Sequence, residues 1–227
     1  MKTTSVIYEK ESVSESDNKP VLAVFDFDKT MSDRHSFWRF LRFVAGPWRF
    51  YSAIFILFPA IIQYYFKKIT LMQLREVVMK YFLADITEKE FQALALRFSQ
   101  EYLPKWISKA AFRRLKWHQD QGHFTALVSN APEVYLQFWA RSAGFDEIIG
   151  SKFEVRDGLV TGRLVGEHCF GIEKVNRLQA TKGPLDQYCI YMYGDSEGDR
   201  EMLALAQFPY YRVFNKDQSA IEPFGRE

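Results

Sequence analysis

The stretch VLAVFDFDKT, residues 21–30, joins a short apolar run directly to acidic and polar residues. Five consecutive apolar residues are typical of a parallel strand that is buried on both faces. The acidic residues would then lie where this strand opens into a loop. In open parallel sheets, ligands bind beyond the carboxyl ends of the strands. The stretch therefore predicts a buried first strand that delivers Asp26 and Asp28 to a binding site.

Three further apolar runs have the character of buried strands, and helical patterns lie between them. Strands that alternate with helices predict an α/β fold, a Rossmann-like doubly wound parallel sheet with helices on both faces. The further apolar runs cover residues 124–128, 188–193 and 210–214, and the helical patterns cover residues 132–143, 172–179 and 199–206.

Polar residues follow two of these later strands, as they follow the first. Ser129 and Asn130 come directly after the second predicted strand, and Gly194 and Asp195 come after the third. Because the carboxyl ends of parallel strands meet at one edge of the sheet, these residues and the acidic residues of the first strand should converge. The convergence predicts a single site.

Residues 33–120 interrupt the alternation, since they carry helical patterns and no strand signal. An insert between the first and second strands would lie over the strand ends as a cap. The predicted division is therefore a catalytic core of residues 21–32 and 121–227 and a helical cap of residues 33–120. The polar residues 1–20 are expected to form a mobile tail.

Local signals refine this division. Thr70 with Gln73 and Thr87 with Glu90 have the spacing of helix capping boxes. Within residues 153–165 the pair Asp157-Gly158 separates two extended runs, which predicts a β-hairpin.

Composition limits the class of protein. The chain has 227 residues, of which 48% are hydrophobic and 26% charged, as in a globular protein. Its net charge of +2 is too small to indicate nucleic-acid binding. The first twenty residues are polar and carry no secretory signal. Only two cysteines occur, and Cys189 lies in a strand-like run, which favours a reduced protein that faces the cytosol.

The polar residues resemble a known set of motifs. The series Asp26-x-Asp28-x-Thr30, Ser129, Lys174 and Gly194-Asp195-Ser-x-x-Asp199 resembles the four ordered motifs of the haloacid dehalogenase superfamily. The position of the insert resembles the subgroup with a helical cap after the first motif, which includes the phosphoserine phosphatases. The resemblance implies a magnesium-dependent phosphatase that works through an aspartyl-phosphate.

The resemblance also implies a role for each residue. Asp26 would be the nucleophile, and Asp28 the general acid and base. A carboxylate is a weak nucleophile, but it becomes effective when it is held in line with phosphorus. The phosphate would be bound by Thr30, Ser129, Asn130 and Lys174, and Mg²⁺ by Asp26, the backbone carbonyl of Asp28 and Asp195, with Asp199 as a support or a water-mediated ligand.

Each of these residues has an ordinary explanation when taken alone. Acidic residues and Ser-Asn pairs after strands are common in turns, an aspartate often caps a helix, and most lysines are solvated. The four ordered motifs together make that explanation improbable. The histidines do not show metal-ligand spacing, so a zinc site is not expected; His35 is placed on the cap side of the site, and the others are His118, His123 and His168.

Lys29 departs from the family pattern, which usually carries a small residue there. Asp28-Lys29-Thr30 also resembles the Asp-Lys-Thr of cation-pumping ATPases, in which the first aspartate is phosphorylated. The predicted strand ends immediately before Asp26, and the chain lacks the several membrane helices of a pump. Asp26 is therefore the predicted nucleophile.

Residues 48–66 are almost entirely apolar and aromatic. As one helix they would span roughly 28 Å, close to the thickness of a bilayer core. A single crossing would place the motifs on opposite sides of the membrane. Pro59 in the middle of the stretch predicts two shorter helices. An interfacial or re-entrant element is the remaining membrane interpretation.

Charge around this stretch supports a membrane partner. Residues 34–75 contain seven cations and no acidic residue, a pattern that suits an anionic lipid surface. The alternative is that the apolar residues form the interior of the cap itself and the cations face water. The seven are Arg34, Arg39, Arg42, Arg49, Lys67, Lys68 and Arg75.

The cap, the run Cys169-Phe-Gly171-x-Glu-Lys174-Val and the Tyr-Gly-Asp-Ser segment are similar to those of bacterial phosphatidylglycerophosphatase C, which usually has Gly at the position of Lys29. This resemblance implies a lipid phosphate substrate, such as phosphatidylglycerol phosphate, at the cytoplasmic face of the inner membrane. The alternatives are a cytoplasmic phosphatase of a small metabolite such as phosphoserine or histidinol phosphate, and a non-catalytic surface protein.

Overall fold

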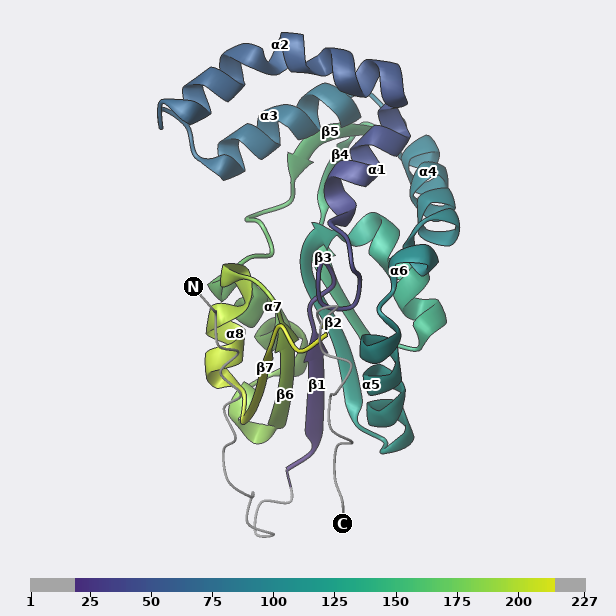
Figure 1. Cartoon of the computed structure of the whole chain (residues 1–227), viewed down its shortest axis with the longest axis vertical. Helices are drawn as coiled ribbons and strands as arrows, with labels where there is room; N and C mark the ends of the chain where they lie inside the picture. The colour runs from purple at the N-terminus through teal and green to yellow at the C-terminus, as the bar shows by residue number, and fades with distance from the viewer. Residues whose placement is uncertain (1–18, 215–227) are drawn as a thin grey trace.

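A five-stranded parallel sheet with helices on both faces lies beneath a layer of helices in the computed structural model, which describes residues 19–214 (Figure 1). The strand order is β3-β2-β1-β6-β7, and a separate hairpin pairs β4 with β5. The strands are β1 (Val21–Phe25), β2 (Phe124–Pro132), β3 (Glu147–Ser151), β4 (Phe153–Arg156), β5 (Leu159–Leu164), β6 (Cys189–Gly194) and β7 (Phe208–Tyr211). The α-helices are α1 (Ser36–Ala45), α2 (Pro47–Tyr65), α3 (Leu71–Leu83), α4 (Glu88–Glu101), α5 (Lys109–Asp120), α6 (Glu133–Ala143), α7 (Ile172–Lys182) and α8 (Arg200–Leu205). Short 3-10 helices cover Leu103–Trp106, Leu185–Gln187 and Glu197–Asp199.

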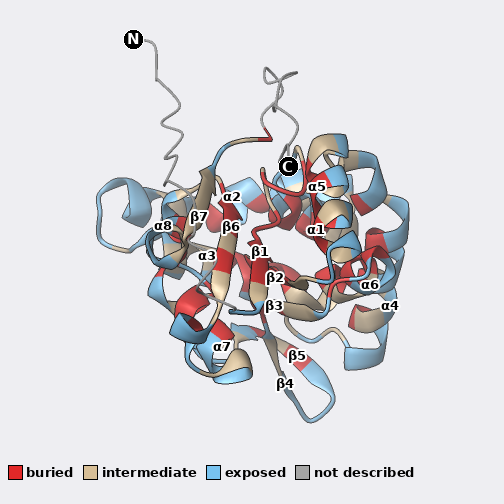
Figure 2. Ribbon diagram, turned by 90° about the horizontal axis from the view of Figure 1, so that it is seen from below, coloured by how far each residue is buried: buried red, intermediate tan, exposed pale blue. Residues whose placement is uncertain are grey.

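The apolar run of β1 is buried on both faces of the sheet, as predicted (Figure 2). Successive side chains of a strand point to opposite faces. Leu22 and Val24 belong to one apolar cluster with residues of α7 and α8, whereas Ala23 and Phe25 belong to another with residues of α5 and α6. The predicted doubly wound α/β fold is confirmed.

Three strands differ from the prediction. Strand β2 continues to Pro132, four residues beyond the predicted end, and therefore contains Ser129 and Asn130. Strand β3 has only Ile148 and Ile149 as an apolar core, so no run marked it. Strand β7 begins at Phe208, two residues before the predicted start, and contains Pro209. Proline is tolerated there because β7 lies at the edge of the sheet and pairs only with β6.

The cap differs from the predicted insert at its carboxyl-terminal boundary and by the addition of a hairpin from later in the chain. Helix α5 was predicted to be part of the cap, but it packs on the sheet, where its His118 contacts the ring of Phe25 in β1. The predicted β4–β5 hairpin forms around Asp157-Gly158 and packs against α3. Helices α1 to α4 and this hairpin therefore form the layer above the strand ends.

Gly162 allows the hairpin to pack closely against α3. Its φ is +75°, and a Cβ atom at this position would lie 2.4 Å from the Cα of Lys80. No residue with a side chain fits this spacing without movement of one backbone. The sequence pattern that predicted the hairpin contained no signal for its partner.

The cap helices begin largely where the capping signals place them. Thr70 and Gln73 form both halves of a capping box at the start of α3. At the start of α4, the Thr87 side chain accepts a hydrogen bond from the Glu90 backbone N–H.

Helix α2 is continuous, and the prediction of two shorter helices at Pro59 was wrong. Pro59 is exposed, so the Phe55 carbonyl that loses its intrahelical partner lies on the open side of the helix. The chain bends instead at Gly46, where α1 and α2 meet at 106°. Among the described residues, no single helix has the length and apolar composition of a membrane span, and only the bent α1–α2 pair meets that test.

Candidate active site

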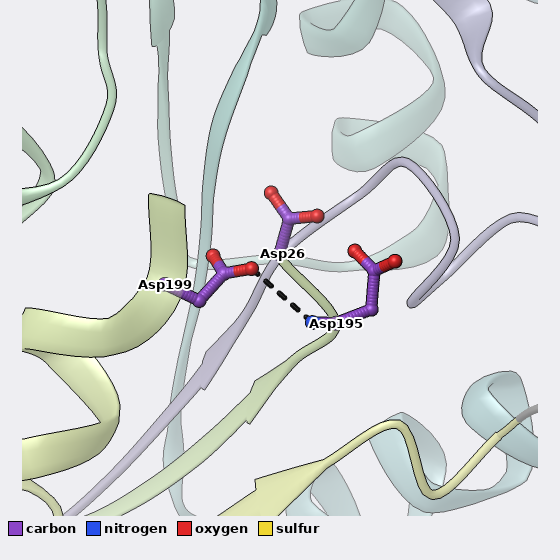
Figure 3. Close-up of side chains that lie close together, drawn as sticks. All are labelled: Asp26, Asp195 and Asp199. Carbon is purple, nitrogen blue, oxygen red and sulfur yellow. Dashed lines mark hydrogen bonds between the residues drawn. The ribbon is translucent and has the colours of Figure 1, made fainter. Parts of the chain in front are cut away.

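Three carboxylates gather at the carboxyl end of the sheet. Asp26 follows β1, Asp195 follows β6, and Asp199 ends the short helix before α8 (Figure 3). Each offers an oxygen that lies within 4.8 Å of the others. The predicted convergence is therefore present for the ends of β1 and β6, and Ser129 and Asn130 are not part of this group of carboxylates.

Backbone contacts fix the positions of these carboxylates. The Asp26 N–H donates to the Tyr193 carbonyl at 2.9 Å, which continues the pairing of β1 with β6. One carboxylate oxygen of Asp199 accepts hydrogen bonds from the backbone N–H groups of Asp195 and Ser196 and from the Ser196 hydroxyl. Gly194 makes this approach possible, because a Cβ atom there would lie 2.6 Å from the Asp199 Cβ.

Lys174 joins two of the carboxylates from the first turn of α7. Its Nζ lies 2.7 Å from Asp26 Oδ1 and 2.6 Å from Asp199 Oδ1, and the side chain is only 2% exposed. Burial lowers the pKa of Lys174, but the negative charges of Asp26 and Asp199 outweigh burial and hold that pKa above its ordinary value. The lysine therefore stays protonated and offsets the charge of the aspartates.

The pKa values of two of the aspartates are also shifted. Burial raises the pKa of Asp26 to about 8, against the lowering effect of Lys174. Burial and the neighbouring Asp199 raise the pKa of Asp195 to about 6. Both shifts come first from burial, which disfavours the charged carboxylate, and a bound cation would favour the charged form again.

The carboxylate of Asp28 lies outside this group. Its Oδ1 accepts a hydrogen bond from the Ser36 backbone N–H at 2.9 Å, at the start of the cap. Burial raises the pKa of Asp28, while the bond from Ser36 lowers it. Asp26 and Asp28 thus occupy different environments although only one residue separates them. The contact of Asp26 with Lys174 favours Asp26 over Asp28 as the nucleophile.

The predicted phosphate-binding residues differ in the hydrogen-bonding groups that they have left for a ligand. The Oγ1 of Thr30 is buried and has no hydrogen-bond partner among the described residues. The Ser129 Oγ accepts from the Ala131 N–H, which leaves its hydroxyl proton for another acceptor. The side-chain carbonyl of Asn130 faces the Ser151 hydroxyl at 3.4 Å, so only its amide group remains for a ligand.

The carboxylate group suits a hard divalent cation. Mg²⁺ prefers oxygen ligands and keeps several waters, so one or two carboxylates suffice. Both oxygens of Asp199 are occupied by donors within the protein. Asp26 and Asp195 are therefore the residues suited to direct contact with Mg²⁺, and Asp199 is suited to support. The backbone carbonyl of Asp28 stays a predicted ligand.

Arg75 is a site residue whose role the sequence did not reveal. It was counted among the cations that face a membrane, but its guanidinium lies 4.5 Å from the ring centre of Phe37, and its buried Nε has no hydrogen-bond partner among the described residues. Burial lowers the pKa of Arg75, against the charges of Tyr135 and Asp28. This cap residue is therefore close to the general acid predicted from the sequence.

Comparisons with known proteins bear on the family and the fold of the chain. The sequence model of the haloacid dehalogenase-like hydrolases matches residues 23–204. Protein CicA of Caulobacter vibrioides is 33% identical over 199 residues, which cover 87% of this chain and 88% of CicA. A Bordetella pertussis Tohama I protein of unknown function is 25% identical with a TM-score of 0.70, covering 82% of this chain and 87% of that one. A phospho-aspartyl intermediate analogue of phosphoserine phosphatase is 18% identical with a TM-score of 0.53, covering 83% and 84%, and it supports the fold alone.

Proposed function

This chain belongs to the haloacid dehalogenase-like hydrolase family, and on that basis we propose that it hydrolyses phosphate monoesters through an aspartyl-phosphate on Asp26. The observation that carries the proposal is the contact of buried Lys174 with Asp26 and Asp199, beside Asp195. This arrangement supports the proposal because Asp26 as nucleophile, Lys174 as a fixed positive charge, and Asp26 and Asp195 as cation ligands would lie close together.

The two half-reactions follow from the two aspartates at the end of β1. An oxygen of Asp26 attacks phosphorus, the bond from phosphorus to the ester oxygen breaks, and Asp28 donates its proton to that leaving oxygen. Asp28, now ionised, then takes a proton from water. The water oxygen attacks phosphorus, which releases inorganic phosphate and restores the Asp26 carboxylate. The raised pKa of Asp28 suits the proton-donating step.

The remaining polar residues hold the phosphate and the cation. Bound Mg²⁺ supplies positive charge to the phosphoryl oxygens. Asp26 and Asp195 would hold it, with the Asp28 carbonyl as a further ligand and Asp199 as a support. Lys174 offsets charge on the phosphoryl group, and the hydroxyls of Thr30 and Ser129 and the amide of Asn130 donate to its oxygens.

We infer that the substrate is a lipid phosphate, such as phosphatidylglycerol phosphate, at the cytoplasmic face of the inner membrane. The support is the cap, because α2 presents large apolar side chains to the outside of the molecule. The competing substrate class is a small phosphorylated metabolite such as phosphoserine, to which Arg75 would offer a second positive charge.

Measurement of phosphate release in the presence of Mg²⁺ tests both the proposed mechanism and the proposed substrate class. Purified protein is assayed against phosphatidylglycerol phosphate in mixed micelles, phosphatidic acid, phosphoserine and histidinol phosphate. Asp26→Asn should fold and lose activity on every substrate, whereas Asp186→Asn, which changes an exposed aspartate, should keep it. Equal activity of Asp26→Asn and the unchanged protein would refute the mechanism. Activity confined to the water-soluble substrates would refute the lipid assignment alone.

A further inference from the structure

Helix α2 presents its apolar residues to the outside of the protein, opposite to the usual arrangement. Six large side chains recur at spacings of three and four residues, which places them on one face of the helix. Trp48 is 90% exposed, Phe55 83% and Tyr65 78%. The full set, named here the α2 face, is Trp48, Tyr51, Phe55, Phe58, Ile62 and Tyr65.

The opposite side of α2 accounts for the attachment of the helix to the cap. Ala53 and Leu57 are buried there, and Phe50 stacks on Phe82 of α3 with ring centroids 5.5 Å apart. This side of α2 is therefore already covered by contacts within the cap. One alternative was that the apolar residues 48–66 form the core of the cap itself. This is true of Ala53 and Leu57, but it does not explain the exposed residues of the α2 face. A contiguous exposed apolar face of this kind marks an interaction site.

Exposed cations lie on both sides of the α2 face along the chain. Arg34, Arg39, Arg42 and Arg49 precede it or lie at its start, Lys67 and Lys68 follow it, and all six are exposed. No acidic residue occurs in residues 34–75. Among residues 19–214, none of the salt bridges includes one of these six cations. The surface is therefore complementary to a partner that is apolar within and anionic at its border.

We propose that the α2 face docks on an anionic lipid bilayer, with the helix lying in the interface and its aromatic side chains between the lipid headgroups. A helix with apolar and aromatic residues on one face and basic residues beside it binds membranes in this way. Figure 1 shows α2 as the outermost element of the cap, with the sheet on the other side of α3. The docked helix thus leaves the catalytic core in water.

A second copy of the chain suits the surface less well. A two-fold dimer joins the same patch of both subunits, so the exposed cations of one copy would face those of the other. Beside the α2 face, Ile56 and Pro59 border a groove of about 480 Å³ between α2 and α3, so this side of the cap is uneven. Protein interfaces need close complementarity of shape, whereas lipid chains adapt to an uneven surface.

Sedimentation with vesicles tests the docking. Full-length protein should sediment with vesicles of phosphatidylglycerol and phosphatidylcholine, less with phosphatidylcholine alone, and less again in high salt. Trp48→Glu with Phe55→Glu should weaken sedimentation at least tenfold. Both side chains are mostly exposed, so the double variant should fold and keep its activity on a soluble phosphomonoester. Leu205→Glu, which also replaces an exposed apolar residue with a glutamate but lies on α8 away from the cap, should bind vesicles as the unchanged protein does.

The inference extends the proposed function, and the two can fail separately. Asp26→Asn should lose activity and still sediment with vesicles. Full vesicle binding by the double variant would overturn the docking while leaving the chemistry intact. The docking would also be overturned if the unchanged protein did not bind vesicles but formed a dimer in solution, and if the double substitution dissociated that dimer. This result would identify a second copy as the partner of the α2 face.

Discussion

Lys174 is buried between Asp26 and Asp199, and its removal would leave two aspartates without their positive neighbour. Breaking a buried ion pair on one side costs about 3 kcal/mol or more. We expect Lys174→Met to lower the free energy of unfolding by about that amount in urea denaturation with EDTA. Because Asp26→Asn removes one of the unpaired charges, the double variant Asp26→Asn/Lys174→Met should recover part of the loss. A Lys174→Met protein as stable as the unchanged one would show that the contact is not an ion pair.

His118 should make stability depend on pH. Its Nε2 lies 2.9 Å from the Tyr193 hydroxyl and its Nδ1 2.8 Å from His123 Nδ1. Burial, with Arg114 and His123 nearby, lowers the pKa of His118 to about 2. The unfolded chain binds this proton below about pH 6.5 and the folded protein does not. Stability is therefore complete above that pH and falls below it.

The expected slope from this group is about 1.4 kcal/mol per pH unit. Urea denaturation is measured at about pH 7.5, 6.0 and 5.5, on either side of the unfolded pKa of about 6.5. As the pH falls, the free energy of unfolding should decrease less in His118→Gln than in the unchanged protein. The exposed His35→Gln should leave the slope unchanged. An identical slope in both variants would assign the pH dependence to other groups.

Single residues show what sequence patterns can and cannot predict about the site. Asp26, Asp195 and Asp199 were predictable because each lies at a fixed distance from a strand end. Arg75 was not, because its position depends on how α3 packs above the sheet, and nothing in its neighbours distinguishes it from the exposed Arg39. Asn130 was predicted to follow the second strand, but it lies within β2, and its contact with Ser151 depends on β3, which was not predicted.

At the scale of elements, the packing of the hairpin on α3 provides the sharpest test. Gly162→Ala would place a Cβ atom against the Lys80 backbone, so we expect a loss of more than about 1 kcal/mol in the free energy of unfolding. Gly166→Ala is the matched control, because Gly166 has a φ of +69° with open space around its Cβ position. Equal losses from the two substitutions would mean that backbone strain, and not the contact with α3, is what matters.

Elements were predicted where the local pattern determines the outcome. The apolar run of β1 specifies a buried strand, and the Thr70 capping box specifies the start of α3. Tertiary contacts decided the others. Helix α5 carries an ordinary helical pattern, and its contacts with the sheet, among them those with Phe25 and Tyr193, assign it to the core. Pro59 did not break α2, because the packed side of the helix holds both halves in place.

At the scale of the whole molecule, the sheet and the cap contribute different residues to the candidate site. The carboxyl ends of β1 and β6 bring Asp26 and Asp195 together under the cap, and the cap supplies Arg75 from one side of α3. The α2 face lies on the far side of the cap. The fold class and the order of the site residues were predictable, since both follow from alternating elements along the chain. The orientation of the charged residues of the cap was not predictable, since it depends on how the helices pack.

Phosphorylation of Asp26 is the central claim at this scale, because it requires the sheet, the cation ligands and Lys174 together. The most direct measurement is rapid acid quenching of the unchanged enzyme during turnover of a phosphomonoester with Mg²⁺, followed by tandem mass spectrometry of the peptide that contains both aspartates of the first motif. The account predicts one phosphoryl group, on Asp26. A phosphoryl group on Asp28, as in the cation-pump pattern of Asp28-Lys29-Thr30, would contradict it.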